Sequence, residues 1–513
     1  MKASTLFVLA VLVAGAFAAE PAKPVPPPTL LRAFGSGEGN WRGGPVVTDV
    51  TGDGKPEIIV SVWNQLQVYS PAGDLLWTAP FAARNYSGAV VGDVNGDGKP
   101  EVIFADNRGV VRVLDGAGKM LPGWPQTVRL EADVRSIASA DVDADGVDEV
   151  VVFSSLTDRG CEPNMYVYEG DGSVKAGWPH YHPNDPYLGK AFNHAGGFNC
   201  NLAVGDLDGD GKLECVFPQD YGSISVFRAD GVPIFVNEKF ASHGAGPRVH
   251  WGEVRSWLDS QSERDKWGAG SQYFLEFTES PATIADIDLD GRPEILAVPN
   301  LESGTVGPWK GTALAVYNLD RTIKQGFDPL PRVTKALIGE GVGGPAEPNV
   351  VAVAGDITGD AKLEIVVTHA DGTCRAYSAE GRELWSVQVL PDGNYAASEP
   401  LLADVTGDGR PDVILLASAK KPAKTTELIV IDGEGRKRLS FAIPFFTLMS
   451  PTIADVTGDG QPELILAATE PGDDGSYVRI YEWDALNRDC IIWPTARGNF
   501  SHTGYLKGGP RAR

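Results

Sequence analysis

The sequence predicts an all-β fold made of eight similar small sheets, and three observations support this prediction. An acidic nine-residue motif lies between short apolar stretches of extended character, and turn and strand signals follow it in a constant order. Successive copies start 44 to 80 residues apart. Repeats of about this length with four strands each are typical of the blades of a β-propeller. The eight copies start at Asp49, Asp93, Asp141, Asp206, Asp286, Asp356, Asp404 and Asp455.

The plainest copy of the motif is Asp455-Val-Thr-Gly-Asp-Gly-Gln-Pro-Glu463. Side chains at positions 1, 3, 5 and 9 and the backbone carbonyl at position 7 can converge on one point, and Gly at position 6 permits a sharp bend. Carboxylates gathered in this way repel one another unless a hard cation lies among them. Ca²⁺ takes six to eight flexible oxygen ligands, so we expect up to eight Ca²⁺ ions.

The motif has two other interpretations. An EF-hand loop begins similarly, but it requires Glu at position 12 and helices on both sides. Position 12 is apolar in every copy, from Val60 in the first to Leu466 in the last, so the motif predicts a turn between two strands. Solvated Asp/Gly turns without metal would explain a single copy. Eight copies in one context favour metal sites.

The predicted ligands occupy positions 1, 3, 5, 7 and 9 of each copy, and position 7 contributes its carbonyl oxygen. In chain order they are Asp49, Thr51, Asp53, Lys55, Glu57, Asp93, Asn95, Asp97, Lys99, Glu101, Asp141, Asp143, Asp145, Val147, Glu149, Asp206, Asp208, Asp210, Lys212, Glu214, Asp286, Asp288, Asp290, Arg292, Glu294, Asp356, Thr358, Asp360, Lys362, Glu364, Asp404, Thr406, Asp408, Arg410, Asp412, Asp455, Thr457, Asp459, Gln461 and Glu463.

The eight copies differ in charge. The third, fourth and fifth offer four carboxylates each, so we expect these copies to bind the ion most tightly. The others carry Thr or Asn at position 3, which keeps an oxygen ligand and lowers the charge. The sixth copy also has Ala361 where the bend favours Gly, so its site at Asp356 is expected to be the weakest.

The residues after each motif predict the rest of a sheet. After Glu101-Val-Ile-Phe come a turn at Asp106–Gly109, a second apolar run and another turn at Asp115–Gly118, and the same order recurs after Glu364 and Asp412. One small sheet cannot bury both of its faces alone. The repeats should therefore stack around an axis as eight four-stranded blades, each with a Ca²⁺-binding loop between its first two strands.

The loops resemble the FG-GAP/VCBS repeats of exported bacterial proteins, which are similar to the calcium-binding blades of integrin α subunits. Ala403-Asp-Val-Thr-Gly-Asp-Gly-Arg-Pro-Asp412 is a good specimen, and the resemblance covers about Gly44 to Gly504. It implies a β-propeller with Ca²⁺ in the turns between the first two strands. It implies little about the ligand, because this architecture serves adhesion, binding and catalysis alike.

Export is predicted from the first residues. Lys2, the apolar run 6–13 and Ala16-Phe-Ala18 form a secretory signal peptide over residues 1–18, and residues 19–28 read as a proline-rich linker. No later stretch is apolar for long enough to insert into a membrane. We therefore expect an exported protein that is located in the periplasm, outside the cell or at the cell surface.

Residues 29–513 are predicted to form a single β-propeller domain with insertions at about 178–200 and 240–281. These long connections should lie opposite the calcium loops, and they are rich in histidine, glycine and aromatic residues, as ligand-contacting loops often are. The formal net charge of −24 argues against nucleic acid as a partner. The leading function is a binding or adhesion module for an extracellular protein or polysaccharide, acting through its long-loop face.

A polysaccharide-degrading enzyme is the alternative, because rhamnogalacturonan lyases are similar calcium-rich eight-bladed propellers. A quinone-dependent dehydrogenase is disfavoured by the absence of adjacent cysteines and by calcium loops in place of tryptophan-docking motifs. The sequence leaves open the ligand, the oligomeric state and whether Cys161 and Cys200 form a disulfide. A lyase would need a base, and spacing selects none of His180, His182, Lys190, His194, His243 and His250.

Overall fold

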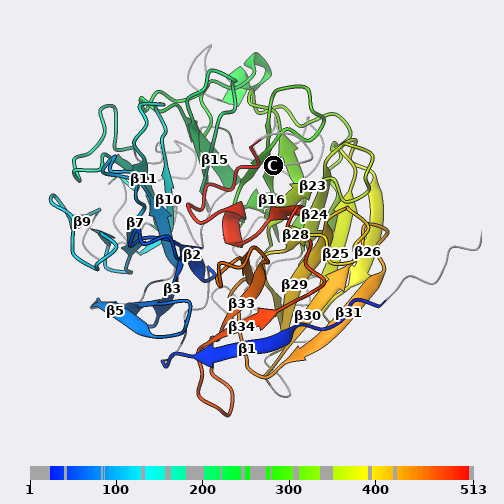
Figure 1. Ribbon diagram of the computed structural model, residues 1–513. Helices are drawn as coiled ribbons and strands as arrows, with labels where there is room; N and C mark the ends of the chain where they lie inside the picture. Colours follow the sequence, from blue (N-terminus) through cyan, green and yellow to red (C-terminus); the bar gives the residue numbers. More distant parts are fainter. Residues whose placement is uncertain are drawn as a thin grey trace, which may run out of the picture.

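The protein is an all-β propeller in which small antiparallel sheets are arranged around a central axis (Figure 1). The computed structural model describes most of the chain between residues 24 and 507. The described residues are 24–37, 39, 43–81, 85, 87–128, 133–155, 163–180, 202–219, 222–243, 249–252, 254, 273–277, 280–303, 311–334, 350–390, 395–419 and 424–507.

Eight of the sheets formed by these residues each contain one acidic loop. The first four contain β2 (Val46–Thr48), β3 (Glu57–Val62), β4 (Gln65–Tyr69) and β5 (Leu75–Pro80); β6 (Ala89–Gly92), β7 (Glu101–Ala105), β8 (Val110–Leu114) and β9 (Gln126–Thr127); β10 (Val134–Ala140), β11 (Glu149–Ser154) and β12 (Met165–Tyr168); and β13 (Ala203–Gly205), β14 (Glu214–Gln219) and β15 (Ser223–Phe227). The next four contain β17 (Thr283–Ala285), β18 (Glu294–Ala297) and β21 (Ala315–Tyr317); β23 (Ala352–Gly355), β24 (Glu364–Thr368), β25 (Thr373–Tyr377) and β26 (Glu383–Gln388); β28 (Leu401–Ala403), β29 (Asp412–Ala419), β30 (Thr425–Ile431) and β31 (Lys437–Ile443), with β27 (Tyr395–Ala397) beside β29; and β32 (Thr452–Ala454), β33 (Glu463–Ala467) and β34 (Val478–Glu482).

A ninth sheet has no acidic loop. It contains β16 (Tyr273–Glu276), β19 (Asn300–Ser303), β20 (Thr312–Ala313) and β22 (Arg332–Val333), and β19 follows β18 closely along the chain. Eight loop-bearing sheets are what eight blades would require. The number of blades nevertheless stays a prediction, because this sheet continues the strands of the fifth.

The number of strands differs among the loop-bearing sheets. The third, fourth and fifth loop-bearing sheets have three strands each among the described residues. In the third, the segment after the last turn meets its neighbour only at two isolated bridges, Tyr168↔Val174 and Met165↔His180. Between these bridges lies Ala176-Gly-Trp178, where Gly177 has a φ of +91°. This backbone interrupts the ladder, so the expected fourth strand is reduced to its ends.

The core consists of the strands that follow each acidic loop. In β33 the sequence Glu463-Leu-Ile-Leu-Ala467 is buried throughout. Both faces of such a strand pack against neighbouring sheets, so it is a continuous apolar run without polar alternation. Outer strands such as β26 are only partly buried.

Tryptophan side chains link neighbouring sheets. The indole nitrogen of Trp77 in β5 donates to the Gly116 carbonyl at 2.9 Å, in the turn after β8 of the next sheet. The expectation that acidic loops stand in place of tryptophan docking was wrong, because the structure contains acidic loops and docked tryptophans together. The same bond joins Trp124 to Gly170, Trp178 to Ala229, Trp251 to Leu319 and Trp385 to Gly433.

The N-terminal strand closes the ring. β1 (Thr29–Phe34) pairs antiparallel with β34, so it is the outer strand of the last sheet (Figure 1). It is the first strand of the described residues. Trp483 also donates to the Pro26 carbonyl at 2.8 Å, which holds the end of the predicted linker against this sheet. The predicted signal peptide lies outside the described residues.

The C-terminal segment occupies the middle of the ring, drawn in red in Figure 1. After β35 (Ile491–Trp493), which pairs with β28, and the 3₁₀ turn η4 (Ala496–Gly498), it runs past the inner strands of several sheets. It binds to the inner strands of these sheets. Its carbonyls accept from the N–H groups of Ile453, Val91, Ser139, Val204 and Ile284 at 2.8–3.0 Å.

Much of the predicted ligand face lies outside the described residues. Most of residues 178–200 and 240–281 lie outside the described residues, as do Cys161 and Cys200; η3 (Glu238–His243) is the described 3₁₀ turn at the start of the second insertion. Among the described residues, no helix has the length and apolar character needed to cross a membrane.

Candidate metal centres

Each of the eight acidic motifs connects the first two strands of a sheet, as predicted. The loops share one face with the short turns that follow the third strands. The turn at Gly116 packs on the first loop so closely that a Cβ on this residue would lie 1.9 Å from the Val50 carbonyl oxygen. Only glycine fits there.

The eight loops have one hydrogen-bond pattern. The carboxylate at position 9 accepts from the N–H of position 2 at 2.8–3.1 Å. The Asp at position 1 accepts from the N–H of position 6 at 2.7–3.1 Å. The Asp at position 5 accepts from the N–H of position 7 at 2.8–2.9 Å. Backbone donors thus fix three of the predicted ligand side chains in every loop.

Two backbone positions in each loop are left-handed, and sequence reasoning identified only one of them. Position 6 has a φ of +68° to +94°, and position 4 also lies in this region. Ala361 at +68° still donates to Asp356 at 3.0 Å, so the sixth loop keeps the common shape. Ala144 and Leu289 occupy position 4 of the third and fifth loops at +63° and +59°. Each non-glycine residue in this conformation costs about 1–2 kcal/mol.

Five loops bring three carboxylates to within 4.8 Å of one another. Hard oxygen donors grouped in this way suit Ca²⁺ in chemistry and number, with the position 7 carbonyl available as a further ligand. In the sixth loop the buried Thr358 hydroxyl has no hydrogen-bond partner within the protein, which leaves its oxygen available as a metal ligand. The five groups are Asp49/Asp53/Glu57, Asp141/Asp143/Glu149, Asp206/Asp208/Asp210, Asp286/Asp288/Asp290 and Asp455/Asp459/Glu463.

Burial perturbs the carboxylates at position 9. Loss of hydration, together with the charges of neighbouring aspartates in the same loops, raises the pKa of Glu101, Glu214, Glu364 and Asp412 to about 7. The pKa of Glu57 is raised for the same reason. A divalent cation among these groups would favour their charged forms and oppose this effect.

Side chains from outside the motif contact carboxylates of four loops; in the fourth loop, Arg228 Nε lies 4.0 Å from Asp208 Oδ2. The ammonium groups of Lys175 and Lys324 contact carboxylates of the third and fifth loops. In the seventh loop, Asn487 donates to Asp404 at 2.9 Å, and Arg410, at position 7 of the motif itself, pairs with Asp408 at 2.5 Å. Sequence reasoning did not anticipate these contacts, which alter the donor sets available to an ion.

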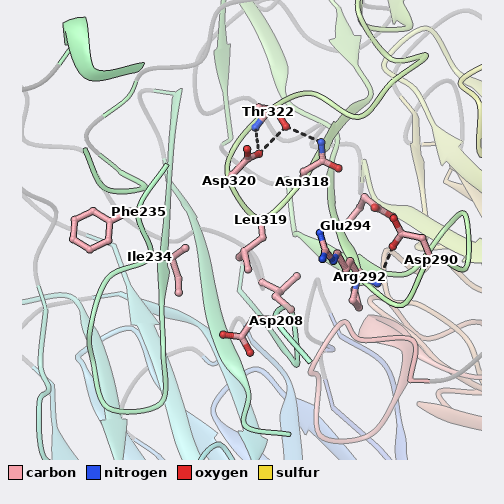
Figure 2. Close-up of a pocket in the computed structure, with 12 residues that line it drawn as sticks. Asp208, Ile234, Phe235, Asp290, Arg292, Glu294, Asn318, Leu319, Asp320 and Thr322 are labelled. Carbon is pink, nitrogen blue, oxygen red and sulfur yellow. Dashed lines mark hydrogen bonds between the residues drawn. The ribbon is translucent and has the colours of Figure 1, made fainter. Parts of the chain in front are cut away.

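A pocket of about 560 Å³ lies between the fourth and fifth loops (Figure 2). Asp208 and Asp290 come from the two loops, Ile234 and Phe235 follow β15, and the turn Asn318–Thr322 follows β21. In that turn, Thr322 donates to Asp320 at 2.6 Å and accepts from Asn318 at 2.7 Å. This pocket is on the loop face and not on the predicted ligand face.

Several described residues of the predicted ligand face contact other parts of the protein. Trp251, expected as a ligand contact, is buried, and its indole nitrogen donates to the Leu319 carbonyl at 2.6 Å. His180 stacks on Phe227 with ring centroids 4.3 Å apart, and His250 meets Phe235 edge-on at 4.4 Å. These three residues serve packing. The candidate bases His182, Lys190 and His194 and the side chain of His243 lie outside the described residues.

Comparison with known proteins supports the repeat assignment. A profile described as an FG-GAP-like repeat matches residues 49–104 and 93–152, which include the first three acidic loops. The chain carries FG-GAP-like repeats. A search of curated protein sequences gave no match.

Solved structures resemble it in fold. Saccharomyces cerevisiae Sqt1 is 14% identical with a TM-score of 0.50, over 89% of this chain and 98% of that one. The Dos1 propeller is 8% identical (TM-score 0.48, 88% and 96% covered). Rhamnogalacturonan lyase PL11 of Bacillus licheniformis is 14% identical (TM-score 0.39, 87% and 90% covered). At such identities the resemblance concerns fold alone.

Proposed function

We propose that this FG-GAP-repeat protein is an exported, calcium-stabilised β-propeller that binds an extracellular protein or polysaccharide. The single observation behind the proposal is the common geometry of the eight loops, in which backbone N–H groups fix three acidic side chains at equivalent positions. Such fixed oxygen donors reduce the ordering cost of binding Ca²⁺.

Calcium in these loops would stabilise the ring rather than act on a substrate. Each loop joins the two strands nearest the axis, and neighbouring loops and turns touch across the gap between sheets. An ion that holds positions 1 to 9 together therefore fixes the start of each sheet. Export to a compartment with abundant Ca²⁺ would keep such sites filled.

The ligand would bind to the long connections on the opposite face, at about 178–200 and 240–281. A closed ring provides a rigid base for variable loops, which is the usual division between scaffold and binding surface. The pocket at Asp208 and Asp290 lies beside two proposed metal loops, so the same ions would shape it.

Metal analysis tests the calcium part of the proposal. The chain from residue 19 onward, equilibrated in millimolar Ca²⁺ and freed of excess ion, should contain at least three Ca²⁺ per molecule. A site at one hundred times its Kd adds about 2.7 kcal/mol of stability, so EDTA should lower the melting temperature by many degrees. Fewer than three ions, or a melting temperature indifferent to EDTA, would contradict the proposal.

Ligand binding needs a separate test. The calcium-loaded chain would be screened against glycans and cell-surface proteins, and a hit should be insensitive to substitutions on the short turns of the loop face, such as Ala117→Asp. Loss of the hit on that substitution would place the working surface on the loop side.

A further inference from the structure

Two of the acidic loops already hold a cation of the protein itself. The Lys175 ammonium nitrogen lies 2.7 Å from Asp143 Oδ2, 2.9 Å from Glu149 Oε1 and 3.1 Å from Glu169 Oε1. Its three N–H donors therefore have three carboxylate acceptors, which satisfies a lysine completely. The side chain is only 9% exposed, so few water molecules compete for these bonds.

The fifth loop repeats this arrangement. The Lys324 nitrogen lies 2.6 Å from Asp288 Oδ2 and 2.6 Å from Glu294 Oε1. In both loops the contacted carboxylates are those of positions 3 and 9, which belong to the predicted ligand set. A divalent ion would need the same two oxygens. It would also meet the positive charge of the ammonium within a few ångströms, so one cation excludes the other.

The backbone places both lysines at one equivalent position. The N–H of Lys175 donates to the Val167 carbonyl and that of Lys324 to the Val316 carbonyl, both at 2.9 Å, just after the turn that follows the third strand. In the fourth sheet, the residue that makes this bond is Ile234, which donates to Val226 at 2.9 Å. The fourth loop has the same four carboxylates as the third and fifth, but an aliphatic side chain where they have lysine. Its cationic neighbour is Arg228, a half-exposed side chain whose Nε lies 4.0 Å from Asp208 Oδ2, so its contact is longer and more open to water than those of the two lysines.

We propose that Lys175 and Lys324 are built-in counter-ions that replace Ca²⁺ in the third and fifth loops, whereas the fourth loop retains the metal. The inference refines the proposed calcium binding, on which the assignment of the fourth loop rests. It reverses part of the charge-based ranking, because two of the three loops richest in carboxylate become independent of metal. Eight loops less these two leave at most six Ca²⁺ sites.

Three substitutions and one control test the proposal in the whole chain. Lys175→Met and Lys324→Met remove the ammonium and keep a side chain of similar reach, so each should raise the calcium content by one ion per chain. Ile234→Lys should lower it by one. Lys212→Met is the control, since Lys212 is exposed at position 7 of the fourth loop, where only the carbonyl is a predicted ligand. Calcium would be counted by elemental analysis after dialysis against millimolar Ca²⁺.

The results separate this inference from the proposed function. Unchanged calcium content in both lysine variants would overturn the counter-ion assignment, even if the wild type binds calcium elsewhere. A wild type without calcium would contradict the proposed function, yet a gain of one ion in each lysine variant would still support the counter-ions.

Melting temperatures give a second measure. In EDTA the lysine variants should melt below the wild type, and Ca²⁺ should restore their melting temperatures. If a lysine variant does not fold, Ile234→Lys still decides, because an unchanged ion count there refutes exclusion by lysine.

Discussion

Replacement of Arg497 by Met tests how the C-terminal segment is held in the ring. Arg497 is 1% exposed, and its guanidinium donates to the carbonyls of Leu202 and Ala282 from two different sheets. Glu399, which is 4% exposed, lies 3.8 Å from the guanidinium. Burial raises the pKa of Glu399, and the Arg497 charge opposes this rise.

The expected loss is about 3–5 kcal/mol, because removal of one partner leaves a buried carboxylate without its counter-charge. The lower end is expected, since the N–H of Arg497 still donates to Glu399 at 2.9 Å and the Trp493 indole donates at 3.2 Å. A loss of this size is a large fraction of the roughly 5–15 kcal/mol that stabilises a folded domain.

Urea unfolding in saturating Ca²⁺ would measure the effect. The double variant Arg497→Met/Glu399→Gln should recover about 2 kcal/mol, because the amide oxygen keeps both acceptor roles without a charge. Arg488→Met, at a largely exposed arginine of the same region, should change stability by less than about 0.5 kcal/mol. Equal losses in the single and double variants would refute the role given to the ion pair.

Three further outcomes are expected. Without metal, in EDTA, the pKa of Glu101, Glu214 and Asp412 in the folded protein is about 7, above the ordinary values of 4.5 for Glu and 3.8 for Asp. Protonation of these groups therefore contributes its full stabilisation below about pH 4, and this stabilisation is lost as the pH rises through 7. The melting temperature should therefore fall between pH 5 and pH 8 without metal and should hold steady in saturating Ca²⁺; a flat metal-free profile would count against buried ionisable ligands. Deletion of residues 491–513 should expose inner-strand N–H groups and lower the melting temperature, and a monomer of undiminished stability would contradict this. Trp124→Phe should cost about 1 kcal/mol through loss of its 2.9 Å bond to Gly170, with unchanged calcium content; a melting temperature equal to that of the wild type would show that this bond between sheets is dispensable.

Local signals in the sequence predicted most of the sheet architecture. The apolar run Val110–Leu114 is β8, and the motifs at Asp93 and Asp404 connect the strands that they were expected to connect. Loops and strand order are encoded within some ten to twenty residues, where spacing and turn chemistry determine structure. The left-handed conformation at position 4 was not predicted, because this position is Gly in six copies but Ala144 and Leu289 in the other two.

Long-range contacts could not be predicted in this way. Lys175 is 26 residues from Glu149 in the chain, and no periodic pattern marks it as a partner. Arg497 donates to the carbonyl of Ala282, which lies 215 residues away in the chain. Such contacts depend on how sheets are arranged around the axis, whereas a repeat specifies mainly the sheet itself. The burial of Trp251 was missed for the same reason, because the turn of the next sheet covers this side chain.

The pairing of β1 with β34 joins the first described strand to one of the last, from Thr29↔Glu482 to Phe34↔Val478. During synthesis, β1 leaves the ribosome hundreds of residues before its partner exists. Any chain cut short before β34 is an open arc with an unpaired edge, which is a template for association with other chains. Only a chain that extends through β34 can therefore pair its own β1. A chain that terminates earlier keeps an unpaired sheet edge, which is accessible to proteases and chaperones.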